Sequence, residues 1–461
     1  MLKGSQVNLF KFQVVSMSTQ KQSPLTLFVA TGLMLFALFF GAGNLIFPAH
    51  MGQQAGESYF QAVFGFVLTG AGLPMLGILA MTFSGARDIQ QLAARVTPWF
   101  GVCFAVALYL SIGPLFALPR TGTVAFEVGV KPFLSEGVSD SLLLLVFSVA
   151  FFAFAYFLAM NPGKLIDRIG KILTPTLLLA IAILAIKTIA DPMGGLTEPQ
   201  ANFQSHPLVE GFLAGYQTMD ALAALVFAII VIASLQSAGV SNNQQLMRMT
   251  MGAGVLAAFC LAVVYGLVTY MGASSVEVLG WLDNGALVLS GIASHYWGTL
   301  GQLLLMIIIF LACLTTAVGL IAACAEYFAR LLPRISYQGY ALIFTLISCV
   351  LANKGLSGII SFSIPVLMLL YPLTVVLILL VFSHSMFKGY HAVYLCTMGL
   401  TFIVGLLDGW KAALGLPDAV NAFLTNYLPW YSIGLGWIAP ALIGFVLGLI
   451  LVACGAKKKV A

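Results

Sequence analysis

The amino-acid sequence predicts an all-α integral membrane protein with twelve transmembrane helices. Composition is the first reason: 61% of the 461 residues are hydrophobic and only 8% are charged, whereas a soluble domain is nearer half apolar and a quarter charged. The second reason is that apolar stretches of about 20 residues, the length that crosses a bilayer, recur along the chain. A soluble globular protein, a disordered chain and a nucleic-acid-binding protein are therefore excluded.

Positive charge is the third reason, and it also orients the chain. The predicted spans are 25–49, 57–83, 99–126, 141–159, 166–189, 207–236, 247–272, 298–329, 338–352, 356–383, 390–407 and 431–454. With residues 1–24 in the cytoplasm, only five of the 20 lysines and arginines fall outside: Arg120, Lys131, Lys187, Lys354 and Lys411. Because these residues collect on the cytoplasmic side of membrane proteins, we expect both tails, 1–24 and 455–461, in the cytoplasm.

Two segments outside the spans, residues 1–16 and the loop 273–297, also allow predictions. Met17 begins a stretch that reads like a natural start, so residues 1–16 are expected to be an upstream extension without a structural role. The loop 273–297 is apolar enough to form short helices over an extracellular mouth.

Histidines and cysteines give no sign of a metal centre. The 5 histidines are scattered, and the 7 cysteines show no CxxC spacing. HExxH, GxSxG and GxxxxGK[ST] motifs do not occur in the sequence, so neither an enzyme nor a nucleotide-driven pump is favoured. A channel would need a continuous polar stripe, whereas only isolated polar clusters occur. The sequence therefore favours a secondary transporter without an organic cofactor.

The first span contains a glycine-rich break. Gly41, Ala42, Gly43 and Asn44 lie near its middle, and Pro48 follows. These residues form a poor helix, and a helix can break inside a bilayer only where it lines a cavity or is buried in protein. The N–H groups of the outer half would attract a carboxylate. The alternative is a small-residue face for helix packing.

The sixth span contains a second break and a carboxylate. Gly211, Gly215, Gln217, Thr218 and Asp220 interrupt an apolar run. An ionised acid within the bilayer costs at least about 2.5–3.5 kcal/mol, so it normally faces a cavity, a cation or a partner. The alternative is a structural aspartate that caps a half-helix. Both interpretations are compatible.

Polar residues in two further spans have less specific patterns. Thr315 and Thr316 are adjacent hydroxyls in an apolar eighth span, which is either an oxygen-only ligand set for a hard cation or a pair of structural side chains bonded to the preceding turn. The third span must bend at its prolines. Its Arg120 and Glu127 form either an extracellular gate pair, a contact with an acidic group, or interfacial anchors.

The positions of the breaks predict an inverted repeat. Spans 1–5 (25–189) and 6–10 (207–383) each contain an odd number of crossings, so the second unit enters the membrane from the opposite side. Corresponding broken helices in two such halves are typical of secondary transporters with a site at the bilayer midplane. Two more spans, within 390–454, follow the repeats.

Three strings carry a family resemblance. The strings FFGAGNLIFPAHMG in span 1, GPLFALPRTGTVAFEVG in span 3 and GYQTMDALAAL in span 6 occur in this order. The chain resembles the bacterial branched-chain amino acid:cation symporters of the BrnQ or LIVCS family from about Thr26 to the last span. The resemblance implies a LeuT-like fold of five plus five inverted helices with two appended, and import of leucine, isoleucine and valine with sodium across the bacterial cytoplasmic membrane.

The resemblance also implies a site, residue by residue. The resemblance implies Gly41, Ala42, Gly43 and Asn44 as substrate-binding residues. As a further hypothesis, the carbonyls near Tyr216, Gln217 and Thr218, with Asp220, take the substrate ammonium. The implied sodium ligands are Ala37, Phe40, Ala312, Thr315 and Thr316, with Asn44 at a possible second sodium. Asp220 either binds the substrate ammonium, holds a cation or carries a coupling proton, and Phe116 and Phe227 are the candidates for the apolar pocket.

The alternative functions are a proton-coupled amino acid transporter and a transporter-like amino acid sensor. The expected partners are leucine, isoleucine, valine, sodium and the lipid bilayer. We expect neither nucleic acid nor an obligate protein partner.

Overall fold

The computed structural model describes residues 24–133, 140–160, 162–240 and 242–455. In the chain's first half the helices are α1 (Pro24–Phe39), α2 (Gly43–Ala55), α3 (Tyr59–Val67), α4 (Leu73–Ser84), α5 (Ile89–Ala93), α6 (Pro98–Leu110), α7 (Ala117–Gly129), α8 (Asp140–Ala159), α9 (Pro162–Ala190), α10 (Ala201–Ser205), α11 (Pro207–Tyr216) and α12 (Asp220–Ser237). In the second half they are α13 (Asn243–Ala273), α14 (Val276–Leu279), α15 (Gly285–Leu331), α16 (Tyr337–Ala352), α17 (Gly355–Phe382), α18 (His391–Leu414), α19 (Asp418–Tyr427) and α20 (Ile438–Ala453).

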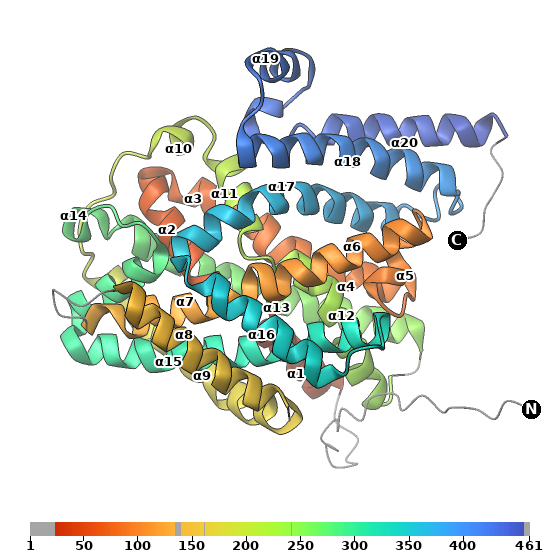
Figure 1. Ribbon diagram of the computed structural model, residues 1–461. Helices are drawn as coiled ribbons and strands as arrows, with labels where there is room; N and C mark the ends of the chain where they lie inside the picture. Colours follow the sequence, from red (N-terminus) through yellow and green to blue (C-terminus); the bar gives the residue numbers. More distant parts are fainter. Residues whose placement is uncertain (1–23, 134–139, 161, 241, 456–461) are drawn as a thin grey trace, which may run out of the picture.

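The long helices run roughly alongside one another (Figure 1). Within the described residues, 8 helical segments are long and apolar enough to cross a membrane, and the shorter apolar helices include Leu178–Ala190, Tyr337–Ala352 and Ile438–Ala453. The chain is thus a multi-pass, all-helical membrane protein. Each of the twelve predicted stretches is mainly helical, while their number as membrane crossings stays a prediction. The expectations about the two tails and residues 1–16 fall outside the described residues, except at their inner edges.

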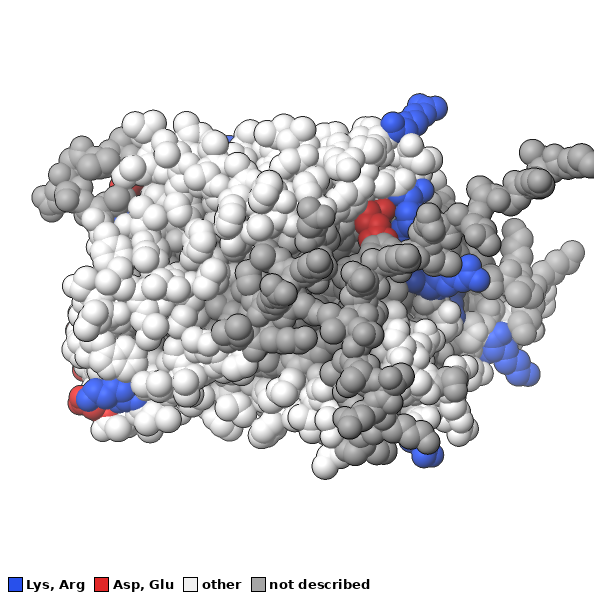
Figure 2. Space-filling model, turned by 90° about the horizontal axis from the view of Figure 1, so that it is seen from below, with Lys and Arg blue, Asp and Glu red and all other residues white. Residues whose placement is uncertain are grey.

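Charged side chains gather at the two ends of the molecule. On the face shown in Figure 2, the described surface between these ends is largely uncharged. Connectivity places Arg87, Arg95, Arg248, Arg334 and Lys388 at the end where α20 finishes, and the opposite end holds cations such as Lys131 and Lys354. An apolar band between two charged rims has the form that a bilayer requires.

Three of the helical spans are interrupted. α1 ends at Phe39 and α2 begins at Gly43, which leaves Phe40–Ala42 between them. α11 ends at Tyr216 and α12 begins at Asp220. Between α6 and α7, a π-helical turn (Ser111–Leu115) contains Pro114 and a non-helical Gly113. The breaks predicted in spans 1, 3 and 6 are therefore present.

The loop after α13 is partly helical, as expected. It holds α14 and the first part of α15, whose helix kinks at Gly298 with a φ of 56°. Glycine tolerates this left-handed backbone without steric cost.

Two pairs of helices meet at glycines. A Cβ placed on Gly272 of α13 would lie 2.0 Å from the carbonyl oxygen of Ala49 on α2. A Cβ on Gly211 of α11 would lie 2.0 Å from the carbonyl oxygen of Ala62 on α3. Because no larger residue fits such contacts, the backbones of these helices touch directly, as in other close membrane packings.

The two broken spans exchange packing partners. α1 and α2 pack against α13, while α11 and α12 pack against α3 and α4. Each broken span therefore rests on the helix that follows the other broken span in the chain. At one edge of the molecule, α18 packs against both α17 and α20 (Figure 1).

Candidate substrate and cation site

The break in span 1 is held by its own asparagine. Asn44 belongs to the first turn of α2, and its Oδ1 accepts a hydrogen bond from Gly41 N at 3.2 Å. The backbone amide of Asn44 donates to Gly41 O at 3.1 Å. The unwound segment is therefore a tight turn around Gly41, and Ala42, Gly43 and Asn44 are all buried.

The break in span 6 is held in an unusual backbone conformation. Met219 has a φ of 62°, in the left-handed region that non-glycine residues rarely adopt. Thr218 Oγ1 donates to Gly215 O at 2.9 Å, so the hydroxyl satisfies a carbonyl at the end of α11. Such strained residues cluster at functional sites.

A buried polar network joins the two breaks. Asn44 Nδ2 donates to Asp220 Oδ2 and also to the hydroxyl of Tyr265 at 2.6 Å. The Tyr265 hydroxyl lies 3.4 Å from Asp220 Oδ2 and 3.2 Å from Gly70 O, to which it donates. Gly70 lies in the π-helical turn between α3 and α4. Asn44 and Asp220, at 2% and 5% exposure, thus link both broken helices to α13 and to the α3–α4 turn.

Asp220 is not a helix cap. Met219, whose side chain makes no capping hydrogen bond, occupies the N-cap position of α12, and Asp220 is the first residue of the helix. The Asp220 carboxylate instead accepts a hydrogen bond from Asn44 and lies 3.4 Å from the Tyr265 hydroxyl. The interpretation of Asp220 as a cap is therefore wrong, and its carboxylate belongs to the buried network between the two breaks.

Arg120 is the second buried charge at this level. Its Nη1 donates to Gln217 O at 2.7 Å, and its guanidinium carbon lies 4.9 Å from the centre of the Phe47 ring. Only 6% of Arg120 is exposed, so it is not an interfacial anchor. Arg120 also does not pair with Glu127, because Glu127 Oε2 lies 3.1 Å from the ammonium of Lys131. The recorded contacts of Arg120 are therefore Gln217 O beside the break in span 6 and the Phe47 ring on α2.

The threonine pair of α15 lies beside the break in span 1. A Cβ on Gly41 would lie 3.6 Å from Thr316 Oγ1. Thr315 Oγ1 donates to Ala312 O at 2.9 Å. Helix α1 ends at Phe39, so carbonyls of its last turn, Ala37 among them, lie beyond the reach of intrahelical donors. The structure thus brings Thr316 close to span 1, while ligation of sodium there stays a prediction.

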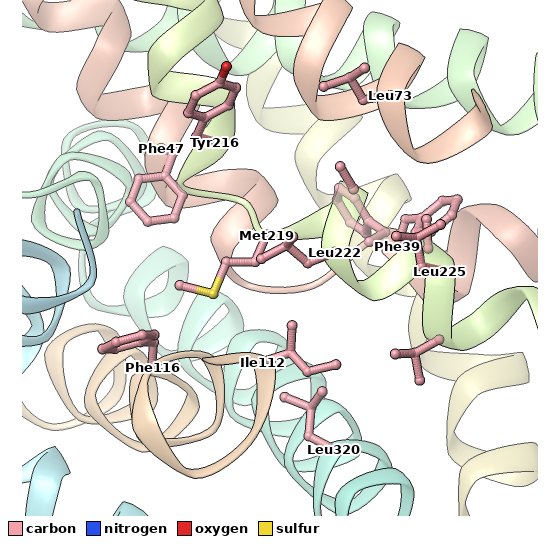
Figure 3. Close-up of a cluster of buried hydrophobic side chains, with 14 of the residues drawn as sticks. Phe39, Phe47, Leu73, Ile112, Phe116, Tyr216, Met219, Leu222, Leu225 and Leu320 are labelled. Atoms are coloured by element: carbon pink, nitrogen blue, oxygen red, sulfur yellow. The ribbon is translucent and has the colours of Figure 1, made fainter. Parts of the chain in front are cut away.

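Large apolar side chains surround the network. In Figure 3 the side chain of Met219 lies between the rings of Phe47 and Phe116 in projection. Tyr216 stacks on Tyr371 of α17 with ring centroids 4.1 Å apart. The suggested Phe116 is buried in this cluster. Phe227 lies two helical turns, roughly 10 Å, beyond Asp220 on α12, which places it farther from the network.

The sequence reasoning missed Tyr265 and the placement of Arg120. The sequence signal for Tyr265 is weak, because it is one of two tyrosines in the second half of span 7. All of the network's polar groups offer oxygen or nitrogen of amide, carboxylate and hydroxyl type. Among the described residues, no cluster of three or more His, Cys, Asp or Glu side chains is placed to hold a metal. The arrangement is suited to bind a small zwitterion or a hard cation.

Comparisons with known proteins find related transport proteins. The family model described as "Branched-chain amino acid transport protein" matches residues 25–454. The branched-chain amino acid permease BrnQ of Bacillus subtilis (strain 168) is 48% identical over 92% of this chain and 96% of its own length. The branched-chain amino acid transport system 2 carrier protein of Pseudomonas aeruginosa is 43% identical over 92% of this chain and 95% of its own length.

Solved structures show the same fold. MhsT in complex with L-phenylalanine has a TM-score of 0.56 at 19% identity, with 92% of this chain and 97% of that chain covered. Mhp1, a nucleobase-cation-symport-1 family transporter, has a TM-score of 0.59 at 11% identity, with 93% and 92% covered. At such low sequence identities the similarity shows only that this chain shares their fold, which is LeuT-like. Since the family model and the relatives cover nearly the whole chain, the resemblance is confirmed: the chain belongs to the family of BrnQ-type branched-chain amino acid transport proteins, which are transporters and not enzymes.

Proposed function

We propose that this protein imports leucine, isoleucine and valine together with sodium across the bacterial cytoplasmic membrane by alternating access. The names of the related permeases support the substrate class. The observation that carries the proposal is the contact of Asn44 with Asp220, which joins the two broken helices in the buried interior.

The network has the groups that a zwitterionic amino acid needs. The N–H groups of Ala42 and Gly43, at the start of α2, would attract the substrate carboxylate. Asp220 and the carbonyls near Tyr216–Thr218 would take the ammonium. The buried side-chain oxygen of Gln217, which has no hydrogen-bond partner among the described residues, is a further acceptor. A hydrophobic pocket distinguishes one methylene by only about 1–3 kcal/mol, so the three substrates should compete.

The packing of the broken spans supports a five-plus-five inverted repeat. The exchange of partners, α1 and α2 on α13 against α11 and α12 on α3 and α4, is what a two-fold relation between residues 25–189 and 207–383 would produce. Such a relation would give the site two equivalent ways to open. The surplus of cations at the end where α20 finishes supports a cytoplasmic location of that end.

The proposed sodium site lies between spans 1 and 8. The carbonyls of Ala37, Phe40 and Ala312 with the hydroxyls of Thr315 and Thr316 would form an oxygen-only set, which suits a hard cation. The approach of Thr316 to Gly41 supports this arrangement. Sodium that bridges α1 and α15 would stabilise the substrate-binding conformation, and the substrate would then raise the affinity for sodium by the same factor.

Uptake into proteoliposomes tests the proposed function. Purified protein is reconstituted, and the accumulation of labelled isoleucine is compared under an imposed sodium gradient and an imposed proton gradient. We expect accumulation with sodium alone. Accumulation with protons alone would contradict sodium coupling and favour Asp220 as a proton carrier. Binding without accumulation under either gradient would contradict transport and favour an amino acid sensor.

Substitution of Thr316 by alanine tests the sodium site. We expect Thr316→Ala to raise the sodium concentration for half-maximal uptake at least tenfold, because a contact with a charged group contributes about 1.5–3 kcal/mol and each 1.4 kcal/mol is about a factor of ten. The ranking of leucine, isoleucine and valine should not change. Thr345→Ala on α16, whose buried hydroxyl bonds only to the preceding turn among the described residues, is the control. Equal sodium dependence in Thr316→Ala and the parent would contradict the site.

A further inference from the structure

We propose that Arg120 binds the carboxylate of the transported amino acid opposite Asp220, so that the zwitterion lies between a buried cation and a buried anion of the protein. This inference deepens the proposed function and rests on it. It adds a side-chain ligand from α7 to a site otherwise formed by the two broken helices.

Arg120 contacts both breaks. Its guanidinium donates a hydrogen bond to Gln217 O at 2.7 Å and lies over the ring of Phe47, one helical turn beyond Gly43 on α2. A Cβ on Gly43 would lie 3.0 Å from Arg120 Nη2. The guanidinium therefore lies against the first turn of α2, where the backbone N–H groups already favour an anion.

Among the described residues, the guanidinium of Arg120 has more N–H donors than recorded acceptors. A guanidinium has five N–H donors in a planar fork that matches a carboxylate. Among the described residues the structure records one acceptor for them, Gln217 O. No hydrogen bond is recorded among the described residues for the other guanidinium nitrogens, so their donors are available to a ligand. A substrate carboxylate at the α2 N-terminus would satisfy them.

The buried charges of Arg120 and Asp220 are opposite in sign. Asp220 is the carboxylate of the buried network, and Arg120 is the buried cation that contacts the two broken helices. The pair of residues is neutral, and so is a zwitterion whose two charges have the complementary arrangement. A ligand that carries only one charge would leave either Arg120 or Asp220 without its counter-charge, at a large desolvation cost. The pair thus selects for ligands that carry both charges.

Ligands that lack one charge provide the test. Binding of labelled L-leucine to the purified full-length protein is measured in competition with leucinamide, at a pH where its amine is protonated, and with 4-methylpentanoate. We expect the parent to bind both analogues at least tenfold more weakly than leucine. In Arg120→Gln, the affinity for leucine should fall roughly 10- to 100-fold. The affinity for leucinamide should stay the same or rise, so that the variant no longer prefers leucine.

Two variants separate recognition from folding. Arg120→Lys keeps the charge but loses the fork, so leucine should weaken less than in Arg120→Gln and leucinamide should not change. Lys131→Gln removes a half-exposed cation near the end of α7 and should leave every affinity unchanged. Equal weakening of leucine and leucinamide in Arg120→Gln or Arg120→Lys would overturn the inference, as would a parent that binds leucinamide as tightly as leucine. Failure of the parent to bind any branched-chain amino acid would instead refute the proposed function.

Discussion

Replacement of Asp220 by asparagine is expected to reduce concentrative uptake of isoleucine at least a hundredfold. Removal of one partner from a buried, hydrogen-bonded charge network costs about 3–5 kcal/mol, and each 1.4 kcal/mol is about a factor of ten. Asparagine has nearly the shape of aspartate, so the contacts with Asn44 and Tyr265 can persist while the charge is lost. The measurement is the initial rate of uptake into proteoliposomes at equal amounts of reconstituted protein.

Asp191→Asn is the matched control for this prediction. Asp191 lies in the exposed loop after α9 and pairs with Lys187 at 2.8 Å, and exposed ion pairs contribute little. Its uptake should equal that of the parent. If Asp220→Asn retained more than half of the parental rate under a sodium gradient, neither an ammonium-binding nor a coupling role of Asp220 would stand.

Replacement of Gly272 by alanine is expected to cause the largest loss of stability among single methyl additions on α13. The new Cβ would lie 2.0 Å from Ala49 O and must push α2 away from α13. Overpacking of this kind costs typically about 1–3 kcal/mol, and more where backbone is displaced. Thermal unfolding of the purified protein, followed by fluorescence-detected size exclusion, should occur at a lower temperature than in the parent.

Gly266 on the same helix provides the comparison. A Cβ on Gly266 meets no atom within 4 Å among the described residues. Because alanine favours a helix over glycine by up to about 1 kcal/mol, Gly266→Ala should unfold at the parental temperature or slightly above it. Indistinguishable unfolding of Gly272→Ala and Gly266→Ala would show that α2 does not press on α13.

Local signals explain which parts of the site were predictable. Gly41–Asn44 and Gln217–Asp220 are anomalies in apolar spans, because their residue types disfavour helix where a bilayer would require it. Their sequence neighbourhood alone therefore predicts breaks, and the structure has them at Phe40–Ala42 and Gln217–Met219. Met219 is the exception, since no propensity predicts a left-handed methionine.

Local residue patterns do not predict contacts between spans that are distant in the sequence. Tyr265 resembles any phenol in an apolar helix, and only its approach to Asn44 and Asp220 gives it a role. The position of Arg120 toward the outer end of span 3 left open a gate pair, a contact with an acidic group and an interfacial anchor. The π-helical turn at Ser111–Leu115 and its non-helical Gly113 precede α7 and thereby set its direction. The resulting burial of Arg120 depends on tertiary packing, which residue type does not encode.

The direct backbone contacts at Gly211 and Gly272 restrict how the molecule can change shape. Helices that touch through carbonyl oxygens have no flexible side chains between them to absorb sliding. α1–α4 and α11–α13 should consequently turn as one rigid body. Arg120 on α7 and Thr316 on α15 both come from outside that body and reach its two breaks. A ligand held at the two breaks by Arg120 and Thr316 would then contact both the rigid body and the helices outside it.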